Sequence, residues 1–229
     1  NRVLLGIPGN HDWYSGLDGF ARMFRARRGS VDRASMVQDD SVDTGGQIGH
    51  LIDWVEAFRV GHFVAKRPTL PLMGYTTVQG ASYFSLHLAP KLDLWGVDRQ
   101  LRTVDYGQRN HFMHERAMFT NEDGAPERGL IVLMSDPAYS MLEPYHIGQR
   151  IMQSLELTFE EDAPLVMTGD THHYCRQIFD RGMHVIAGGG GAFMHPARIA
   201  REGFEPPAAE FPGPRASRVM AWQVPLMVG

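Results

Sequence analysis

The chain has 229 residues, of which 43% are hydrophobic and 21% charged, so it is long enough to bury a full core and has the composition of a soluble globular protein. Its 22 basic and 26 acidic side chains give a net charge of -4, so no global positive field attracts nucleic acid or anionic lipid, and partners of that kind are disfavoured. The single cysteine, Cys175, excludes an internal disulfide and a multi-cysteine zinc site, and fits a reducing compartment such as the cytoplasm.

Apolar runs of strand length alternate along the chain with segments of helical periodicity. The predicted strands lie in RVLLGIPGNHD (2–12), SYFSLHL (82–88), LDLWGVD (92–98), GLIVLMSD (129–136), PLVMTGD (164–170), YCRQIF (174–179) and MHVIAG (183–188). The predicted helices lie in residues 16–28, 101–119 and 147–162. This alternation predicts an α/β fold.

Two segments fit neither pattern. Residues 29–50 are polar and rich in Gly, Asp and Ser, which indicates a loop or insertion, and residues 202–217 form a Pro-rich stretch expected to run extended over the surface. We expect one domain over residues 1–229. No apolar run approaches the ~18 residues of a membrane span. The sequence starts at Asn1 rather than Met and stops in an apolar stretch, so we expect a piece of a longer protein: a soluble cytoplasmic domain, or one attached to membrane segments outside this chain.

Polar residues gather where the predicted strands finish. They are Asn10, His11 and Asp12; Asp98; Ser135 and Asp136; and Asp170, His172 and His173. Loops that leave the carboxyl ends of strands share one edge of an α/β sheet, so these loops would bring oxygen and imidazole ligands together. The simpler interpretation is that Asp and Asn at strand ends only form turns. Turn formation alone can explain any single loop, and we adopt this interpretation for Asp98. It explains the whole set of polar strand ends less well.

Four of these motifs together resemble the calcineurin-like metallophosphoesterases in order and rough spacing. They are GNHD at 9–12, LWGVD at 94–98, SDP at 135–137 and GDTHH at 169–173. The likeness covers almost the whole chain and is greatest to a subgroup with GD-x-HHY followed by GGGGAF-x-HP, here GDTHHY and GGGGAFMHP at 188–196. The resemblance implies two packed β-sheets flanked by helices, a phosphoesterase sandwich that this chain contains incompletely at its N-terminal side.

The resemblance implies a hydrolase of phosphoesters that binds two divalent ions. Such ions, ~4 Å apart, clamp the phosphoryl oxygens, activate a water for in-line attack and stabilise the leaving oxygen. By position, His172 would bind the first ion, and Asn10 and Asp170 the second. His11 would sit over the phosphate as a proton or hydrogen-bond donor, and Asp12 would orient its imidazole. The substrate would be a phosphorylated small molecule or another phosphoester.

The sequence departs from the family pattern in two places. Ser135-Asp136-Pro137 stands where the family has His-x-Pro; Asp136 can replace that histidine as a metal ligand, whereas Ser135 is a poor ligand. The family's Asp-x-His and Gly-Asp motifs precede GNHD, but only nine residues precede Asn10. The metal-bridging aspartate is therefore expected upstream of this chain.

Other residues add detail to the expected site. Gly188 to Gly191 are predicted to form a tight turn where backbone approaches the site closely. His173 and His195 are candidates to line the substrate pocket, although a histidine hydrogen-bonded within a loop is the commoner case. The expected ions are manganese, iron or zinc. Manganese is favoured because Asp170 adds a hard oxygen where the family has a histidine.

Two alternatives stay open. One is a degenerate domain of the same fold that binds a phosphorylated ligand or a protein without hydrolysis, as the missing histidine at Ser135 suggests. The other is a mononuclear hydrolase with its ion on Asp170, His172 and His173. Adjacent residues of a strand point to opposite faces, so that set needs the chain to have turned into a loop.

Overall fold

The structure is a computed structural model of the whole chain. It describes residues 2–14, 16–25, 74–100, 104–118, 128–140, 143–188, 194–196 and 206–227. The predicted loop at 29–50 lies outside the described residues. Within these ranges, no helix is both long and apolar enough to cross a membrane.

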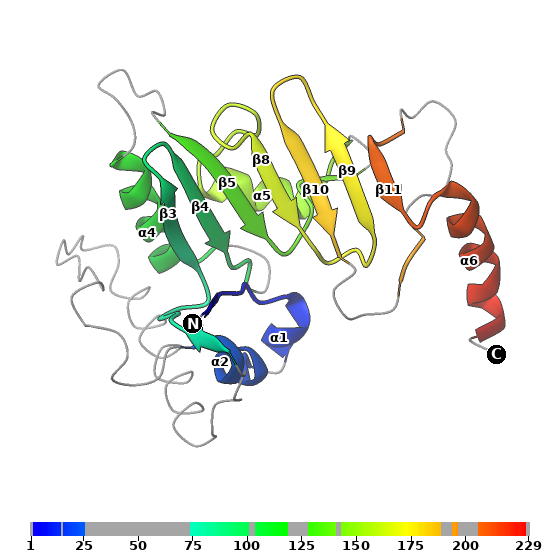
Figure 1. Cartoon of the computed structure of the whole chain (residues 1–229), viewed down its shortest axis with the longest axis horizontal. Helices are drawn as coiled ribbons and strands as arrows, with labels where there is room; N and C mark the ends of the chain where they lie inside the picture. The colour runs from blue at the N-terminus through cyan, green and yellow to red at the C-terminus, as the bar shows by residue number, and fades with distance from the viewer. Residues whose placement is uncertain are drawn as a thin grey trace.

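A mixed seven-stranded sheet forms the centre of the molecule, with the strand order β11-β9-β10-β8-β5-β4-β3 (Figure 1). Its strands are β3 (Phe84–Ala89), β4 (Leu92–Val97), β5 (Gly129–Met134), β8 (Leu165–Thr168), β9 (Tyr174–Ile178), β10 (Met183–Ala187) and β11 (Ala209–Phe211). β4, β5, β8 and β10 run parallel, whereas β3, β9 and β11 pair antiparallel with their neighbours. The α/β fold predicted from the alternating pattern is confirmed.

Two helices cover one face of this sheet and close the core. They are α4 (Tyr106–Ala117), capped by the Asp105 side chain, which accepts from the Gln108 backbone N–H at 2.9 Å, and α5 (His146–Ser154). On β5, burial alternates, so that Val132 and Met134 pack under the helices. The ring of Trp95 on β4 stacks on Phe112 of α4 with ring centroids 4.7 Å apart.

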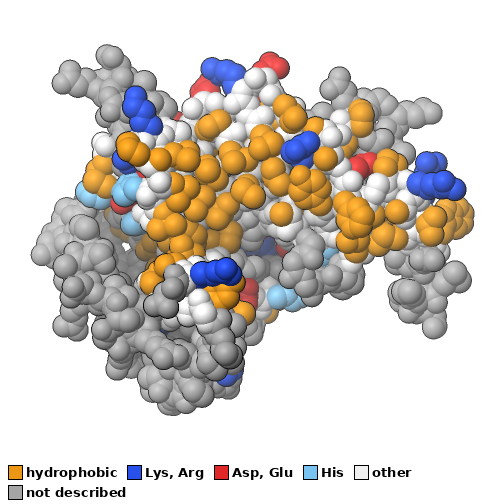
Figure 2. All heavy atoms as spheres, viewed as in Figure 1, with side chains coloured by type: hydrophobic (Ala, Val, Ile, Leu, Met, Phe, Trp, Pro, Cys, Tyr) orange, Lys and Arg blue, Asp and Glu red, His pale blue; other side chains and the backbone are white. Residues whose placement is uncertain are grey.

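The opposite face of the sheet is apolar. The alternation that buries Val132 directs Ile131 and Leu133 to this face, and the register sets Leu165 beside Ile131 and Met167 beside Leu133. Figure 2 shows hydrophobic side chains gathered over the strands here. Sheets made of parallel strands are normally covered on both faces. None of the described helices packs on this face.

Short elements complete the described fold. β1 (Arg2–Leu4) pairs in parallel with β2 (Tyr75–Thr77), β6 (Tyr139–Ser140) pairs with β7 (Glu143–Pro144), and α1 (Asn10–Tyr14), α2 (Asp18–Phe24) and α6 (Pro214–Met227) are helices. The buried Gln79 side chain joins the first pair to the chain before α1, because it accepts from the Gly6 N–H at 2.6 Å and donates to the Gly6 carbonyl at 2.9 Å.

Several element boundaries differ from the sequence predictions. The strand predicted to run into GNHD ends at Leu4, and Asn10 begins a helix instead. The helices predicted over 101–119 and 147–162 are shorter in the structure, as α4 and α5. α5 ends at Ser154, and a loop that carries the buried Leu157 and Phe159 follows it. In the Pro-rich stretch at 202–217, residues from 206 onward are described: 209–211 are extended in β11, and α6 begins at Pro214.

Gly148 of α5 gives a test of how closely this helix packs on the loop after β5. A Cβ built on Gly148 would lie 2.0 Å from the Pro137 carbonyl oxygen, a backbone atom that cannot swing aside. We expect Gly148→Ala to lower the free energy of unfolding by roughly 2–3 kcal/mol, as overpacking does.

The matched control is Gly19→Ala in α2, where an added Cβ meets nothing within 4 Å. That change should be neutral or stabilise by roughly 0.5–1 kcal/mol. Urea unfolding followed by circular dichroism measures both variants. Equal stability of Gly148→Ala and wild type would contradict the described packing.

Candidate functional site

The carboxyl ends of β4, β5 and β8 meet at one edge of the sheet, and the segments that follow them lie together there. These segments are residues 98–100, 135–137 and 169–173. The Gly169 N–H donates to the Ser135 carbonyl at 3.0 Å, which joins the loop after β5 to the loop after β8. Helix α1, with its GNHD residues, is attached to the same edge through a hydrogen bond from Trp13 Nε1 to Asp98 Oδ1 at 2.8 Å.

Helix α1 carries His11 and Asp12. His11 is exposed, and its ring meets Tyr14 edge-on with centroids 5.7 Å apart. Asp12 Oδ2 accepts from the Gly9 N–H at 2.9 Å, which fixes the turn that starts the helix. The roles proposed for His11 and Asp12 stay predictions. The Asn10 backbone begins α1, but its side chain lies outside the described residues, so its role as a ligand is equally a prediction.

Asp98 is fully buried and does more than form a turn. Its Oδ1 accepts from the Gln100 N–H at 2.7 Å, the turn-forming bond expected from the sequence, and also from Trp13 of α1. Burial raises the Asp98 pKa to about 6, although hydrogen bonds from Ser82, Gln100 and Trp13 oppose that rise. The side chain therefore combines a local turn with a long-range attachment that the sequence analysis missed.

Asp136 forms a buried ion pair with Arg99, and this pair was not foreseen. The Arg99 guanidinium donates through Nη1 to Asp136 Oδ1, and Ser135 Oγ donates to Oδ2 at 2.8 Å. Burial raises the Asp136 pKa, the bonds from Ser135 and Arg99 lower it, and the nearby charge of Asp170 raises it again. Asp136 as a metal ligand stays a prediction.

The segment after β8 has an unusual backbone. Asp170 and His172 have φ values of 63° and 48°, in the left-handed region that side chains with a Cβ rarely adopt. Each such residue costs of order 1–3 kcal/mol unless its surroundings hold it in place, and such residues concentrate at functional sites. The chain has left the strand here, so Asp170, His172 and His173 are not limited to the alternating faces of β8.

Gly188 at the end of β10 holds this segment closely. A Cβ on Gly188 would lie 2.6 Å from the His172 backbone N, so only glycine fits. The predicted close approach of backbone to the site is confirmed for Gly188; Gly189 to Gly191 lie outside the described residues. The Gly188 N–H also donates to the His173 carbonyl at 2.9 Å.

Three histidines meet at this end of the site. The rings of His172 and His195 stack with centroids 5.1 Å apart, and the His195 N–H donates to the His172 carbonyl at 3.0 Å. His173 Nδ1 contacts the Thr171 carbonyl at 2.8 Å, which is the bond within a loop that the simpler interpretation expected. Burial lowers the His173 pKa. Within the described ranges, no set of three or more His, Cys, Asp or Glu side chains is arranged to hold a metal ion.

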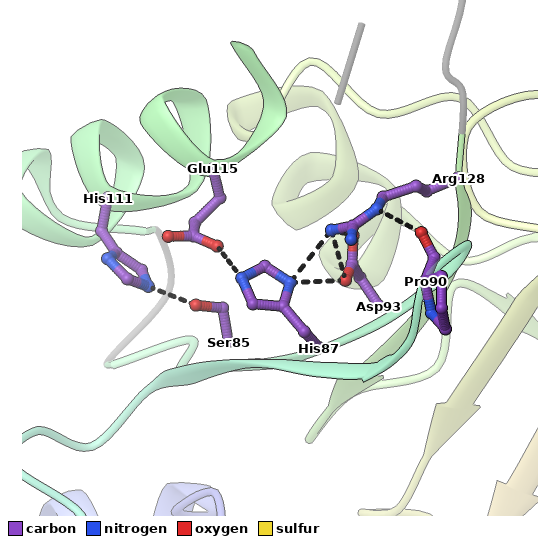
Figure 3. A network of polar contacts seen from close by, with 7 residues as sticks. All are labelled: Ser85, His87, Pro90, Asp93, His111, Glu115 and Arg128. Atoms are coloured by element: carbon purple, nitrogen blue, oxygen red, sulfur yellow. Dashed lines mark hydrogen bonds and ion pairs between the residues drawn. The ribbon is translucent and has the colours of Figure 1, made fainter. Parts of the chain in front are cut away.

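A second polar cluster lies at the opposite edge of the sheet, near the starts of β4 and β5 (Figure 3). His87 Nδ1 lies 2.7 Å from Asp93 Oδ1, and its Nε2 lies 3.8 Å from Glu115 Oε2. Arg128 Nη1 donates to both Asp93 oxygens at 3.2 Å. His111 on α4 contacts Ser85 Oγ at 3.2 Å. The acidic Asp93 and Glu115 lie among the potentially basic His87, Arg128 and His111, which is the pattern of a structural cluster.

Comparisons with known proteins give a likeness in structure. No family model and no curated protein matches the chain. Among solved structures, the chain is similar to GAP50, described as the anchor in the inner membrane complex of Plasmodium, with a TM-score of 0.42 and 10% sequence identity. The match covers 59% of this chain and 45% of that one, so it spans less than half of GAP50. At this level the likeness carries no argument about function.

The raised Asp98 pKa predicts a pH effect on stability. Between pH 3.8 and about 6 the folded carboxyl keeps a proton that the unfolded one has lost, so Asp98 makes the fold progressively less stable as pH rises through this window. Asp98→Asn keeps an oxygen acceptor for Trp13 without the charge. The stability of Asp98→Asn minus that of wild type should therefore increase from pH 4 to pH 7, by up to about 3 kcal/mol at 1.4 kcal/mol per pKa unit.

Urea unfolding of both proteins at each pH measures this difference. Taking the difference removes other groups that titrate in the window, such as the buried His184, whose pKa burial lowers to about 4. A difference that stays constant with pH would show that the Asp98 pKa is not raised in the fold.

Proposed function

We propose that this chain is part of a metal-dependent phosphoester hydrolase of the calcineurin-like type, which uses two divalent ions. The observation that carries the proposal is that the loops after β5 and β8, which carry Asp136, Asp170 and His172, are joined at the carboxyl edge of the sheet by the Gly169 to Ser135 hydrogen bond. Ligands bind at this edge in α/β sheets. The family comes from the resemblance of the sequence motifs. The fold supports that resemblance because the segments 98–100, 135–137 and 169–173 lie at one edge of the sheet, with the GNHD helix attached there.

Asp136 and Asp170 offer carboxylate oxygens, which suit a divalent cation such as Mn²⁺. Within the described ranges no three His, Cys, Asp or Glu side chains are arranged to hold an ion, so the proposal takes further ligands from outside these ranges. Asp170 is exposed, and an ion can reach it from solvent. Asp170, His172, Asp136 and Asn10 are the residues that would hold the ions. When bound, two such ions polarise the phosphoryl oxygens and lower the pKa of a water to supply the nucleophile.

The remaining residues would handle the substrate. His11 is exposed on α1, so its imidazole could reach a substrate and give a proton to a leaving oxygen. The hydrogen bond from Trp13 to Asp98 would keep α1 beside the site. His173 with its lowered pKa is neutral near pH 7 and can donate or accept a hydrogen bond. His195, stacked on His172, would shield that side of the site and contact the substrate.

The proposal also includes the two-sheet sandwich that the family resemblance implies. The apolar face opposite α4 and α5 is where a second packed sheet would lie, and the upstream motifs of the family would come with it. Burying Ile131, Leu133, Leu165 and Met167 would contribute about 25 cal/mol for each Å² removed from water.

One observation favours a binding module without hydrolysis. Asp136 already has both carboxylate oxygens bonded, one by Arg99 and one by Ser135, at the position where the family has a histidine ligand. A site with this position occupied by an internal ion pair could retain a phosphorylated ligand without assembling the second ion. Counting the ions bound by the longer protein separates the two functions.

Metal binding tests the proposal on this chain directly. We expect calorimetric titration to show weak binding of Mn²⁺, because this chain does not contain the family's metal-bridging aspartate, with Mn²⁺ preferred over Zn²⁺. Asp170→Asn should abolish the heat of binding. Asp170→His, which replaces an oxygen by an imidazole, should shift the preference toward Zn²⁺.

The matched control is Asp180→Asn, a change of the same charge in the turn between β9 and β10 at the other edge of the sheet. It should leave both affinities unchanged. An unaltered metal ranking in Asp170→His would remove Asp170 from the site. Tight binding of two ions by this chain would contradict the expected upstream ligand.

His11 is tested in the longer protein, with an aryl phosphate as substrate. If His11 protonates the leaving oxygen, His11→Asn should lower kcat by ~100-fold or more, with the metal content unchanged, because general acid catalysis contributes 10²–10⁴-fold. Loss of metal together with activity would make His11 a ligand. Unchanged kcat would remove it from the reaction.

A further inference from the structure

Helix α6 presents one face that combines basic and apolar side chains. Arg215, Arg218, Val219 and Trp222 are spaced i, i+3, i+4 and i+7, which aligns them along one side of the helix. Both arginines are exposed, and Val219 and Trp222 are 53% and 81% exposed. The opposite side carries Ser217, which is buried and donates through Oγ to the Pro212 carbonyl at 2.9 Å.

The strand before this helix adds two exposed aromatic rings. Phe211 of β11 is 58% exposed and stands directly opposite Tyr174 of β9, which is 36% exposed. β11 is the last strand of the sheet, and α6 continues beyond it at the end of the molecule (Figure 1). One end of the protein therefore carries Trp222, Tyr174, Phe211 and Val219 in contact with water.

We propose that this end, the face of α6 together with Phe211 and Tyr174, docks on the surface of an anionic lipid bilayer. Trp and Tyr prefer the boundary between headgroups and hydrocarbon, where the ring body is apolar and its polar atom stays hydrated. Arg215 and Arg218 lie within one turn of the exposed apolar side chains and would pair with lipid phosphates. Interfacial helices bury bulky apolar side chains at the headgroup boundary and use nearby basic side chains to hold anionic lipids, and Trp222 and Val219 with Arg215 and Arg218 supply both kinds.

The charge of α6 favours an anionic bilayer over a second copy of the chain as the partner of this face. Residues 214–227 contain two arginines and no acidic residue, although the chain as a whole carries a net charge of -4. A symmetric dimer through this face would bring the same basic patch against itself, which is repulsive. An anionic bilayer attracts the patch and repels the rest of the surface, so it would also orient the molecule.

Vesicle co-sedimentation tests the proposal. The chain should bind vesicles of equal parts phosphatidylcholine and phosphatidylglycerol, and bind pure phosphatidylcholine far more weakly. The double change Arg215→Gln and Arg218→Gln should weaken binding roughly 25-fold, at roughly fivefold for each basic residue. Trp222→Ala should weaken it about tenfold or more.

Two control variants change similar side chains elsewhere. Leu88→Ala removes a half-exposed apolar residue of β3, and Arg181→Gln removes an exposed charge in the turn before β10; neither should alter vesicle binding. Absence of binding to anionic vesicles by wild type, or equal binding by the α6 variants, would overturn the proposal. So would a concentration-dependent dimer in sedimentation velocity that Trp222→Ala dissociates, because that assigns the face to a second copy.

Discussion

The candidate site depends on the fixed position of Asp98 and Arg99, directly after β4. Gln108 of α4 holds the backbone there, because its side-chain oxygen accepts from the Asp98 N–H at 2.7 Å and its amide donates to the Asp98 carbonyl at 2.7 Å. The Asp98 side chain then holds Trp13 of α1, and the Arg99 side chain holds Asp136 after β5. Two consecutive residues thus connect three otherwise separate segments. Burying the Asp98 carboxylate loses the free energy of its hydration, and its hydrogen bonds to Trp13 and Gln100 offset that loss.

The segment after β8 shows the same dependence on surroundings. Asp170 and His172 stay in the left-handed region because bonds to neighbouring loops hold them, from Gly169 to Ser135 on one side and from His195 and Gly188 on the other. Gly188 permits the close approach because it lacks a Cβ. The geometry of Asp170 and His172 is thus set by the packing of three loops and not by the regular strand before them.

The sequence predicted the parts of this structure that depend on local periodicity. The buried strands at 92–97 and 129–134 and the turn at Asp98 follow from apolar runs and from residue type. It did not predict the ion pair of Arg99 with Asp136, because a basic residue after a strand carries no signal of a partner 37 residues away. Nor did it predict that Asn10 starts a helix, since Pro8 and Gly9 indicate a turn and the helix of five residues is stabilised by Asp12 and Trp13.

The two edges of the sheet differ in how their charges are satisfied, and this difference separates structure from function. At the starts of β4 and β5, the Asp93 carboxylate contacts His87 and Arg128, and the Glu115 carboxylate lies 3.8 Å from His87 Nε2, so both carboxylates have oppositely charged or potentially charged neighbours within the fold. At the carboxyl edge, Arg99 compensates Asp136, while Asp170 adds a charge that no described ion pair compensates. Asp170 is exposed, so water solvates its charge, and its carboxylate stays open to solvent on a segment whose backbone is held in the left-handed region. Backbone of this kind concentrates at functional sites, which is why the carboxyl edge, and not the cluster at the other edge, is the better candidate for the proposed site.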